Sequence, residues 1–366
     1  MSAVTALCAF FPNLNMHPIE NYLNELELWF LIGVVFLIGL AGLGAVYQQL
    51  AIARDRLKYP SRGKHINVDG YWLHFHDMGN GTPTVVIDSG AGGFSLEWML
   101  VAPAVAKFTR VCTYDRAGLG RSQSNGKART SQQCVNELRT LLAAAGLTPP
   151  YLLVGHSFGG MNVRLYTSQY PEEVVGMVLI DPGHEDFHLQ CTPERQRKDR
   201  QELQLYFWGQ IVSVLGLVRL LGSIGLLPMI QKFKSRRLTY TPELRALFTE
   251  FEAYWYQSQY CKTVYSELSN LKTSSEQVRT ARLRLNIPLI ILSRGGRLHL
   301  SSHIAEVDAR NEEIWHKLQA DLVNLSCESI HWIASHSDHH IHLDQPDLVV
   351  RAIYDVVKKV RQGRDA

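Results

Sequence analysis

A serine flanked by glycines stands between a short apolar run and a segment that can form a helix. The run from Tyr151 to Val154 leads into Gly155-His156-Ser157-Phe158-Gly159, and a helix-compatible stretch from Met161 to Gln169 follows. This order predicts a sharp strand-to-helix turn that exposes the hydroxyl of Ser157 and points the free N–H groups of the helix toward it. The two glycines are expected where a Cβ would collide with neighbouring chain. The pattern therefore predicts that Ser157 is a nucleophile.

A nucleophilic serine needs a base, and four histidines late in the chain could provide one. The serine hydroxyl is a weak nucleophile at neutral pH, so a base must lie within hydrogen-bond reach and a third group must orient that base. The segment from Ser335 to Pro346 follows the last expected strand and contains His336, His339, His340 and His342. A metal site made of these histidines is the less favoured alternative, because no matching second set of ligands is visible.

Short apolar strands alternate with helical segments on both sides of a long insertion. Strands are expected at 84–88, 111–114, 151–154, 174–180, 286–292 and 330–334, and helices at 96–107, 131–146, 318–325 and 346–360. A hairpin is expected within 65–79, because the two-residue turn Asp69-Gly70 joins alternating runs. This alternation predicts a mostly parallel sheet with helices on both faces. Binding residues gather at the carboxyl ends of such strands, where Ser157 and the glycine-rich breaks fall.

Length and composition are those of an ordinary globular protein. The chain has 366 residues, of which 46% are hydrophobic and 19% charged, with a formal net charge of +3. That length is ample for one large core and an insertion. The net charge is too small to indicate a nucleic-acid partner. The six cysteines show no CxxC spacing, so we expect unpaired thiols and neither a disulfide framework nor a zinc site.

An uncharged stretch near the start predicts one transmembrane helix. No charged residue occurs from Leu28 to Ala53, and about twenty apolar residues suffice to cross a bilayer. A cleavable signal peptide fits less well, because a basic segment before the stretch is missing. A buried soluble helix is the other alternative. Positive charge follows the stretch at once, which by the positive-inside rule places the large domain in the cytoplasm: Arg54, Arg56, Lys58, Arg62 and Lys64.

The alternation of strands and helices stops between residues 185 and 285. The run from Tyr206 to Ile230 is strongly apolar and flanked by basic residues, which suits a second membrane span, but topology argues against one. One more crossing would put the later strands on the opposite side of the membrane from Ser157, and Arg219 lies in its middle. We expect instead a helical cap over the site, with an apolar inner wall and a face that can rest on lipid. A helical insertion with its own core is the simpler alternative.

Four patterns, in this order, resemble those of the α/β-hydrolase superfamily, especially its lipase- and esterase-like members. They are Ser89-Gly90-Ala91-Gly92-Gly93, Tyr114-Asp115-Arg116-Ala117-Gly118-Leu119-Gly120, Gly155-His156-Ser157-Phe158-Gly159-Gly160, and the segment from Ser337 to Pro346. The resemblance covers about residues 65–360. It implies an α/β-hydrolase fold with a helical cap, preceded here by the transmembrane helix. Matching the last pattern assigns the base to His339 and leaves His336, His340 and His342 as loop or supporting residues.

The resemblance also bears on the acid and on the oxyanion hole. Superfamily members most often carry the acid after the strand at 286–292, where this chain has no carboxylate until Glu306 and Asp308. Asp181 ends the preceding strand, a position that some members use, so Asp181 is favoured and Asp308 is second. An oxyanion hole needs two N–H donors. We expect them from Phe158, directly after the nucleophile, and from Ala91, with Gly92 as the alternative. Asp115 and Arg116 are expected to brace their loop.

These observations predict six segments: an N-terminal segment at 1–27, a transmembrane helix at 28–53, a basic linker at 54–64, a first core part at 65–184, a helical cap at 185–285, and a second core part at 286–366. The predicted function is a membrane-anchored serine hydrolase that cleaves a lipophilic carboxylic ester without metal or organic cofactor. Amide, thioester, lactone and C–C bonds remain open as targets. Epoxide hydrolase and haloalkane dehalogenase chemistry would require Asp in place of Ser157. A non-catalytic binding protein is the alternative of a different class.

Overall fold

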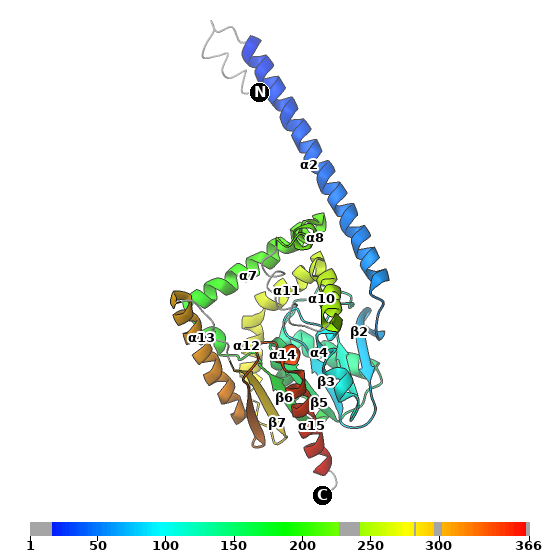
Figure 1. Ribbon diagram of the computed structural model, residues 1–366, viewed down its shortest axis with the longest axis vertical. Coiled ribbons are helices and arrows are strands. Elements are labelled where there is room, and N and C mark those ends of the chain that lie inside the picture. The colour runs from blue at the N-terminus through cyan, green and yellow to red at the C-terminus, as the bar shows by residue number, and fades with distance from the viewer. Residues whose placement is uncertain (1–16, 227–241, 282, 296–301, 364–366) are drawn as a thin grey trace.

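The computed structural model describes residues 17–226, 242–281, 283–295 and 302–363, without the side chains of 17–24, 242–244 and 302–308. A long helix stands away from a body in which helices cover both faces of a sheet (Figure 1). The sheet has eight strands in the order β1-β2-β4-β3-β5-β6-β7-β8. Their bounds are β1 Lys64–Val68, β2 Tyr71–Met78, β3 Thr84–Asp88, β4 Val111–Tyr114, β5 Tyr151–His156, β6 Val174–Ile180, β7 Leu289–Arg294 and β8 Ser329–Ala334.

The predicted parallel sheet is confirmed. The pairs from β4 and β3 through to β8 are parallel, whereas β1 and β2 form the predicted antiparallel hairpin, and β2 also pairs antiparallel with β4. Asp69 and Gly70 form the hairpin turn with φ of 52° and 92°, the left-handed geometry that a two-residue turn demands.

Side chains on the central strands alternate between two apolar layers. In β5, Tyr151 and Leu153 lie in the layer shared with α4 (Ser131–Ala144) and α5 (Phe158–Gln169). Leu152 and Val154 face the layer of α3 (Ala102–Val105) and α15 (Pro346–Gln362). Because helices cover both faces, every residue of β5 is buried, and the strand begins with the apolar run from Tyr151 to Val154.

The helix expected at 96–107 is wrong in its extent. The segment contains a 3₁₀ turn at Ser95–Trp98 and the short helix α3, which begins at Ala102 with Pro103 in its first turn. Proline lacks the N–H that a continuing helix would need and is tolerated only in a first turn. The chain therefore starts a new helix there.

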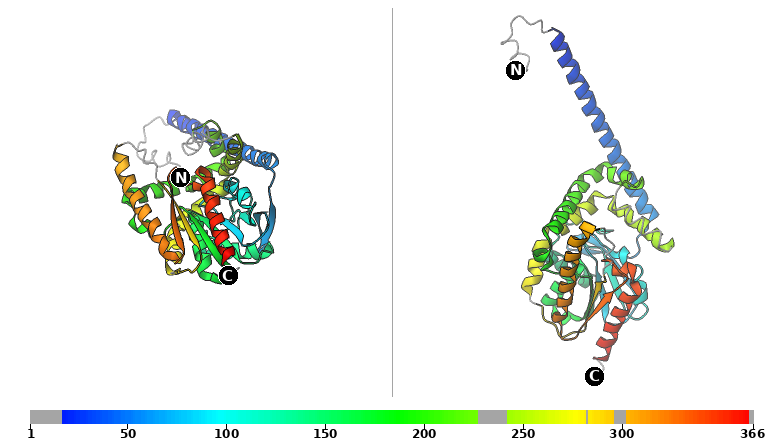
Figure 2. Two further views of the ribbon diagram at one scale, coloured as in Figure 1. Left: turned by 60° about the horizontal axis from the view of Figure 1, so that its bottom comes forward. Right: turned by 60° about the vertical axis from the view of Figure 1, so that its left-hand side comes forward.

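The insertion is helical, as predicted, and most of it lies over the carboxyl ends of the strands (Figure 2). Its helices are α6 (Phe187–Gln190), α7 (Pro193–Val212), a 3₁₀ turn Ser213–Leu215, α8 (Leu217–Ser223), α10 (Pro242–Trp255), α11 (Ser258–Ser269) and α12 (Leu271–Ala281). Aromatic residues of α10 and α11 pack on Phe94 and Leu119 from the core loops. The last helix, α12, instead packs against α4 and α5 and joins the layer over the sheet. Residues 227–230 of the apolar run lie outside the described residues.

Helix α2 (His17–Lys58) contains the predicted apolar stretch and extends beyond it at both ends. Its portion Glu25–Lys58 has a mean hydropathy of 2.4 over its most apolar window and, within the described chain, is the single unbroken helix long and apolar enough to cross a membrane. Helices α7 and α8 pass the same test only as a pair bent by 95°. Five cysteines are unpaired in the described part, four of them buried, and Cys8 lies outside it.

Candidate active site

Ser157 occupies a strained position between β5 and α5. Its φ of 51° and ψ of −116° lie in a region that a residue with a Cβ rarely adopts, at a cost of about 1–3 kcal/mol. The glycines allow the turn to fit. A Cβ at Gly159 would lie 2.3 Å from the Asp88 carbonyl oxygen, and one at Gly155 would lie 2.6 Å from the Gly159 carbonyl oxygen. The geometry is that expected for the strand-to-helix turn.

The turn is fastened to the end of the neighbouring strand β6. The Ser157 amide donates to the Ile180 carbonyl at 3.2 Å, and the Gly183 amide donates to the Ser157 carbonyl at 2.8 Å. Asp181 lies between these two anchors. The backbone therefore keeps Ser157 and Asp181 at the same edge of the sheet.

Asp181 contacts His339, which lies in the loop after β8 (Ser329–Ala334). The distance from His339 Nδ1 to Asp181 Oδ2 is 2.6 Å, and the Asp181 side chain is completely buried whereas that of His339 is 34% exposed. An imidazole held in this way donates Nδ1–H to the carboxylate and leaves Nε2 free to accept a proton. The structure thus brings two of the three predicted triad residues together.

Two further side chains hold the Asp181 carboxylate, and neither role is predicted from the sequence. Arg294 Nη1 donates to Oδ2 at 2.7 Å, and Trp315 Nε1 donates to Oδ1 at 2.8 Å. Burial by itself would raise the pKa of Asp181, but the hydrogen bond from His339 and the charge of Arg294 lower it to about 2. Asp181 is therefore a carboxylate at neutral pH. The second candidate, Asp308, falls on α13 (Ser302–Asp321), and its side chain lies outside the described residues.

His156, directly before the nucleophile, holds the backbone of the candidate base. Its Nε2 donates to the His339 carbonyl oxygen at 2.8 Å, and the two rings lie 4.7 Å apart. Burial, reinforced by the nearby His342 and His339, keeps the pKa of His156 well below its usual value, so the ring is neutral. The pattern Gly-x-Ser-x-Gly gives no signal for this role, because its second position accepts any residue.

No hydrogen bond between Ser157 and His339 is present in the described part of the chain. Ser157 is partly exposed at the strand edge, and a Cβ on Gly90 would lie 2.8 Å from His156 Nδ1 and 3.2 Å from Ser157 Cβ. Catalytic hydrogen bonds are often long in ligand-free enzymes and tighten only with substrate bound. The arrangement is compatible with a serine and a base that align on binding.

The loop after β3 lies beside Ser157, as an oxyanion hole requires. The Gly92 amide is already engaged, because it donates to Glu267 Oε2 at 2.7 Å. Within the described residues the amides of Ala91 and Phe158 have no hydrogen-bond acceptor. This difference favours Ala91 over Gly92 as the second donor.

Arg116 clamps this loop to the cap. It donates to the carbonyls of Ser89 and Gly90 at 2.7 and 2.6 Å, and it pairs with Asp88 at 2.6 Å and with Glu267 of α11 at 2.8 Å. All three charged side chains are almost completely buried, so each charge depends on its partner. Glu267 thus joins both Arg116 and the Gly92 amide. This geometry agrees with the expectation that Arg116 braces its loop. The contribution of Glu267 from the cap carries no signal in the sequence.

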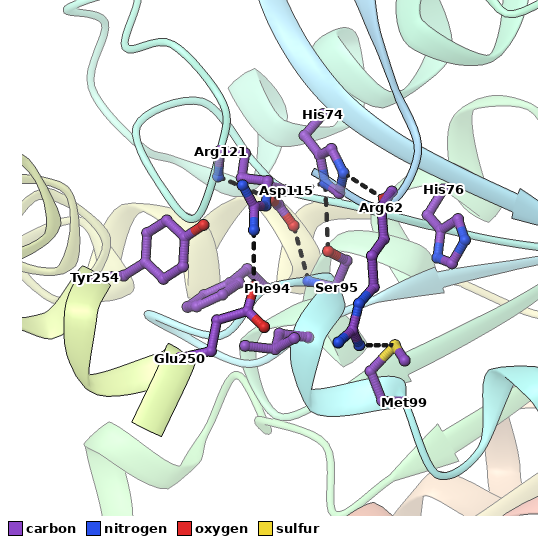
Figure 3. A pocket seen from close by; sticks show the side chains of 11 residues that line it. Arg62, His74, His76, Phe94, Ser95, Met99, Asp115, Arg121, Glu250 and Tyr254 are labelled. Atoms are coloured by element: carbon purple, nitrogen blue, oxygen red, sulfur yellow. Dashed lines mark hydrogen bonds and ion pairs between the residues drawn. The ribbon is translucent and has the colours of Figure 1, made fainter. Parts of the chain in front are cut away.

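A second cluster of serine, histidine and aspartate near the linker lacks the geometry for catalysis (Figure 3). Asp115 Oδ2 and Ser95 Oγ both lie next to the same ring nitrogen of His74, Nδ1, at 3.0 and 3.4 Å. The other nitrogen, Nε2, donates to the Arg62 carbonyl at 2.8 Å. Neither nitrogen is free to take a proton from the serine. The cluster lines a small cavity of about 20 Å³ and ties the linker to the core.

Two other histidines of the segment after β8 differ in burial from the candidate base. His342 is completely buried and stacks on Trp98 with ring centroids 4.5 Å apart, whereas His336 is exposed. Glu97 lies 3.9 Å from His342 Nε2, and burial raises the pKa of Glu97 to about 8. In the described chain no group of three or more His, Cys, Asp or Glu side chains is arranged to hold a metal ion.

Comparison with known proteins agrees with this architecture. Residues 83–212 match a family model described as alpha/beta hydrolase fold. The uncharacterized protein YqjL of Bacillus subtilis is 30% identical over 295 residues, which cover 80% of this chain and 91% of that protein. The human (lyso)-N-acylphosphatidylethanolamine lipase is 30% identical over 105 residues, 28% of this chain and 30% of that protein. A thermophilic esterase structure from Thermogutta terrifontis superposes with a TM-score of 0.55 at 18% identity, covering 82% of this chain and 99% of the esterase.

Proposed function

The chain belongs to the α/β-hydrolase superfamily, and from this premise we propose that it is a membrane-anchored serine hydrolase that cleaves a lipophilic carboxylic ester. It is a hydrolase of the esterase and lipase type. We propose in addition its nucleophile, the bond that it cleaves and its membrane anchor. The observation that carries the proposal is the 2.6 Å contact of His339 with Asp181 at the sheet edge where the strained Ser157 lies.

In the proposed reaction, Ser157 Oγ attacks the ester carbonyl while His339 Nε2 takes the hydroxyl proton. The amides of Phe158 and Ala91 stabilise the negative charge that develops on the carbonyl oxygen. His339 then gives the proton to the leaving alcohol, and an acyl group remains on Ser157. A water molecule, deprotonated by the same histidine, releases the acid. Asp181 orients His339 and stabilises its charged form throughout.

Two features support a lipophilic substrate. The cap wall above the loops is rich in aromatic side chains, among them Phe251, Trp255 and Tyr260. The partial relative from human is a lipase by name, although the similarity spans only 30% of that protein. For the anchor, the supporting feature is the apolar helix Glu25–Lys58. The basic residues after it favour a cytoplasmic catalytic domain by the positive-inside rule.

Labelling with a fluorophosphonate probe, which reacts with activated serines, tests the nucleophile. We expect the full chain to be labelled and Ser157→Ala to be unlabelled. Ser168→Ala is a matched control on the same helix, because its hydroxyl bonds only to the Leu165 carbonyl and should leave labelling intact. Residual labelling of Ser157→Ala would refute the assignment, and an unlabelled wild type would favour the non-catalytic alternative.

Turnover of p-nitrophenyl esters of increasing chain length tests the base and the substrate class. His339→Ala should reduce kcat by about 10⁴-fold or more, as removal of a triad member does. His336→Ala should keep most of the activity, since this residue is exposed and its one described hydrogen bond is through its backbone amide. A preference that rises with acyl length is expected; a preference for acetate would contradict a lipophilic substrate.

A further inference from the structure

The outer surface of the cap carries an apolar ridge that nothing in the described chain covers. From Leu203 to Leu226 the chain has one charged residue, Arg219, and that residue is buried. Nine large apolar side chains in this stretch, here named the cap ridge, are each at least 39% exposed: Leu205, Phe207, Trp208, Ile211, Val214, Leu217, Leu220, Ile224 and Leu226. Exposed apolar patches of this kind mark surfaces that bind something.

The cap ridge bends where it meets helix α2. Figures 1 and 2 both show α8 beside α2. At the bend, a Cβ on Gly44 would lie 2.3 Å from the Leu215 carbonyl oxygen, and a Cβ on Gly216 would lie 2.9 Å from the Tyr47 ring. Glycine on both sides therefore permits the two segments to touch through their backbones. This contact fixes the position of the ridge along the axis of α2.

The contact lies within the uncharged part of α2. Gly44 precedes Arg54 by ten residues, which at 1.5 Å per residue is about 15 Å along the helix. The hydrocarbon core of a bilayer is about 30 Å thick. If α2 crosses the membrane with its uncharged residues in that core, the bend at Leu215 and Gly216 lies well below the lipid surface.

The polar side chains at this contact are turned inward, and Arg219, Gln48 and Asp55 are linked to one another. Arg219 donates to Gln48 Oε1 at 3.0 Å and pairs with Asp55 at 2.8 Å, and Gln48 Nε2 donates to the Tyr256 carbonyl at 2.7 Å. Gln48 is 1% exposed and Arg219 8% exposed. Polar side chains at this depth are tolerated when they face protein and bond to one another. The surface left to the surroundings is apolar.

We propose that the cap ridge is embedded in the lipid leaflet beside the C-terminal half of α2, without crossing the bilayer. Lipid acyl chains contact the exposed side chains of the ridge. The 95° bend between α7 and α8 suits an element that enters the membrane surface and leaves on the same side. The inference rests on the proposed membrane anchor. Its consequence is that the cap meets the bilayer directly, so that a lipophilic ester reaches the site from the membrane and not from water.

Depth-dependent quenching tests the position of the ridge in the full chain. A fluorophore is attached to a single cysteine at Leu217, at Leu43 of α2 or at Lys358 of α15, in a background in which Cys8 and Cys327 are serine. The remaining four cysteines are buried. Leu43 is 69% exposed next to Gly44, and Lys358 is exposed near the opposite end of the molecule. In phosphatidylcholine vesicles with nitroxide on the acyl chains, the labels at Leu217 and Leu43 should be quenched alike and the label at Lys358 should not.

Each other outcome has a separate meaning. An unquenched label at Leu43 would refute the membrane anchor itself, and with it the premise. Quenching at Leu43 but not at Leu217, with the Leu217 label open to aqueous iodide, would leave the anchor standing and refute the embedded ridge. A Leu217 label protected from both quenchers would show that protein and not lipid covers the ridge, which also overturns the inference.

Activity gives a second readout. The triple variant Trp208→Ser, Leu217→Ser, Leu220→Ser should lose about tenfold or more of its turnover of an ester dissolved in vesicles, because apolar burial in lipid is removed. Its turnover of a soluble short-chain ester should stay unchanged. The matched control replaces three similarly exposed apolar residues far from α2: Ile330→Ser, Ile333→Ser and Tyr354→Ser. Equal losses in the two triple variants, or a loss on both substrates, would refute the inference.

Discussion

Arg294 ends strand β7 and donates through Nη1 to Asp181 Oδ2, at the end of neighbouring strand β6, at a distance of 2.7 Å. The superfamily resemblance places the acid most often after this later strand. Here that place holds a cation that faces the carboxylate on the adjacent strand. Arg294 therefore compensates the buried charge of Asp181.

The ionised state of Asp181 should be visible in stability as well as in activity. Because its pKa is lowered to about 2 from an ordinary value near 4, its ionised form stabilises the fold above about pH 4, and this contribution is lost as pH falls toward 2. The shift corresponds to about 2 kcal/mol, to order of magnitude. Urea unfolding of wild type at pH 5 and near pH 2 should show the loss. Arg294→Gln should move the loss to higher pH; an unchanged pH dependence in this variant would contradict the pairing.

Asp181→Asn should reduce kcat by about 10³- to 10⁴-fold, because an amide cannot stabilise the charged histidine or enforce its tautomer. Steady-state turnover of the preferred p-nitrophenyl ester measures the effect, and circular dichroism confirms that the variant is folded. A folded Asp181→Asn variant with near-normal turnover would move the role of acid elsewhere, with Asp308 the next residue to examine.

His156 is expected to act as a positioning residue through the backbone of His339. Replacing it with Phe removes the donor to the His339 carbonyl and should lower kcat by about tenfold, the size of one buried hydrogen bond. His156→Gln can donate to the same carbonyl and should recover much of that loss. A purely steric role predicts instead that the Phe variant, which keeps a ring, outperforms the Gln variant.

Glu267 is expected to link the cap to the oxyanion loop. Glu267→Gln leaves the buried Arg116 with one charged partner fewer and weakens the hold on the Gly92 amide. We expect kcat to fall by about 10- to 100-fold with KM little changed, since an oxyanion donor acts in the transition state. Glu250→Gln is the matched control, because Glu250 also joins the cap to a core arginine, Arg121, at 2.8 Å, and that ion pair involves neither Arg116 nor the Gly92 amide. Equal effects of the two variants would indicate general loosening of the cap.

Glu97 should make the protein less stable as pH rises. Its pKa is raised by burial to about 8, so the neutral acid is favoured in the folded state and the cost of ionising it grows between about pH 4.5 and pH 8. Glu97→Gln resembles the neutral form and carries no such cost. The variant should therefore match the wild type near pH 4.5 and exceed its stability at pH 8.5 in urea unfolding. A constant difference across this range would show that Glu97 is ionised throughout.

The sequence by itself determined the local elements of the core. Runs such as Thr84–Asp88, Val111–Tyr114 and Val174–Ile180 coincide with strands, because a strand buried on both faces must be short and apolar whatever its neighbours are. The glycines around Ser157 specify the turn for an equally local reason, since the backbone there leaves no room for a Cβ. Signals of this kind lie within ten residues of one another.

The tertiary structure decided which distant residues meet. Arg294 faces Asp181 across 113 residues, and Glu267 faces Arg116 across 151, and neither pair has a spacing that a pattern could reveal. Both contacts exist because parallel strands align their carboxyl ends and the cap folds back over them. The contact of Gly44 with Leu215 is of the same kind. The apolar run between 206 and 226 is predicted from the sequence as part of a cap or of an insertion with its own core. Only the tertiary structure shows that part of it forms an exposed ridge beside α2.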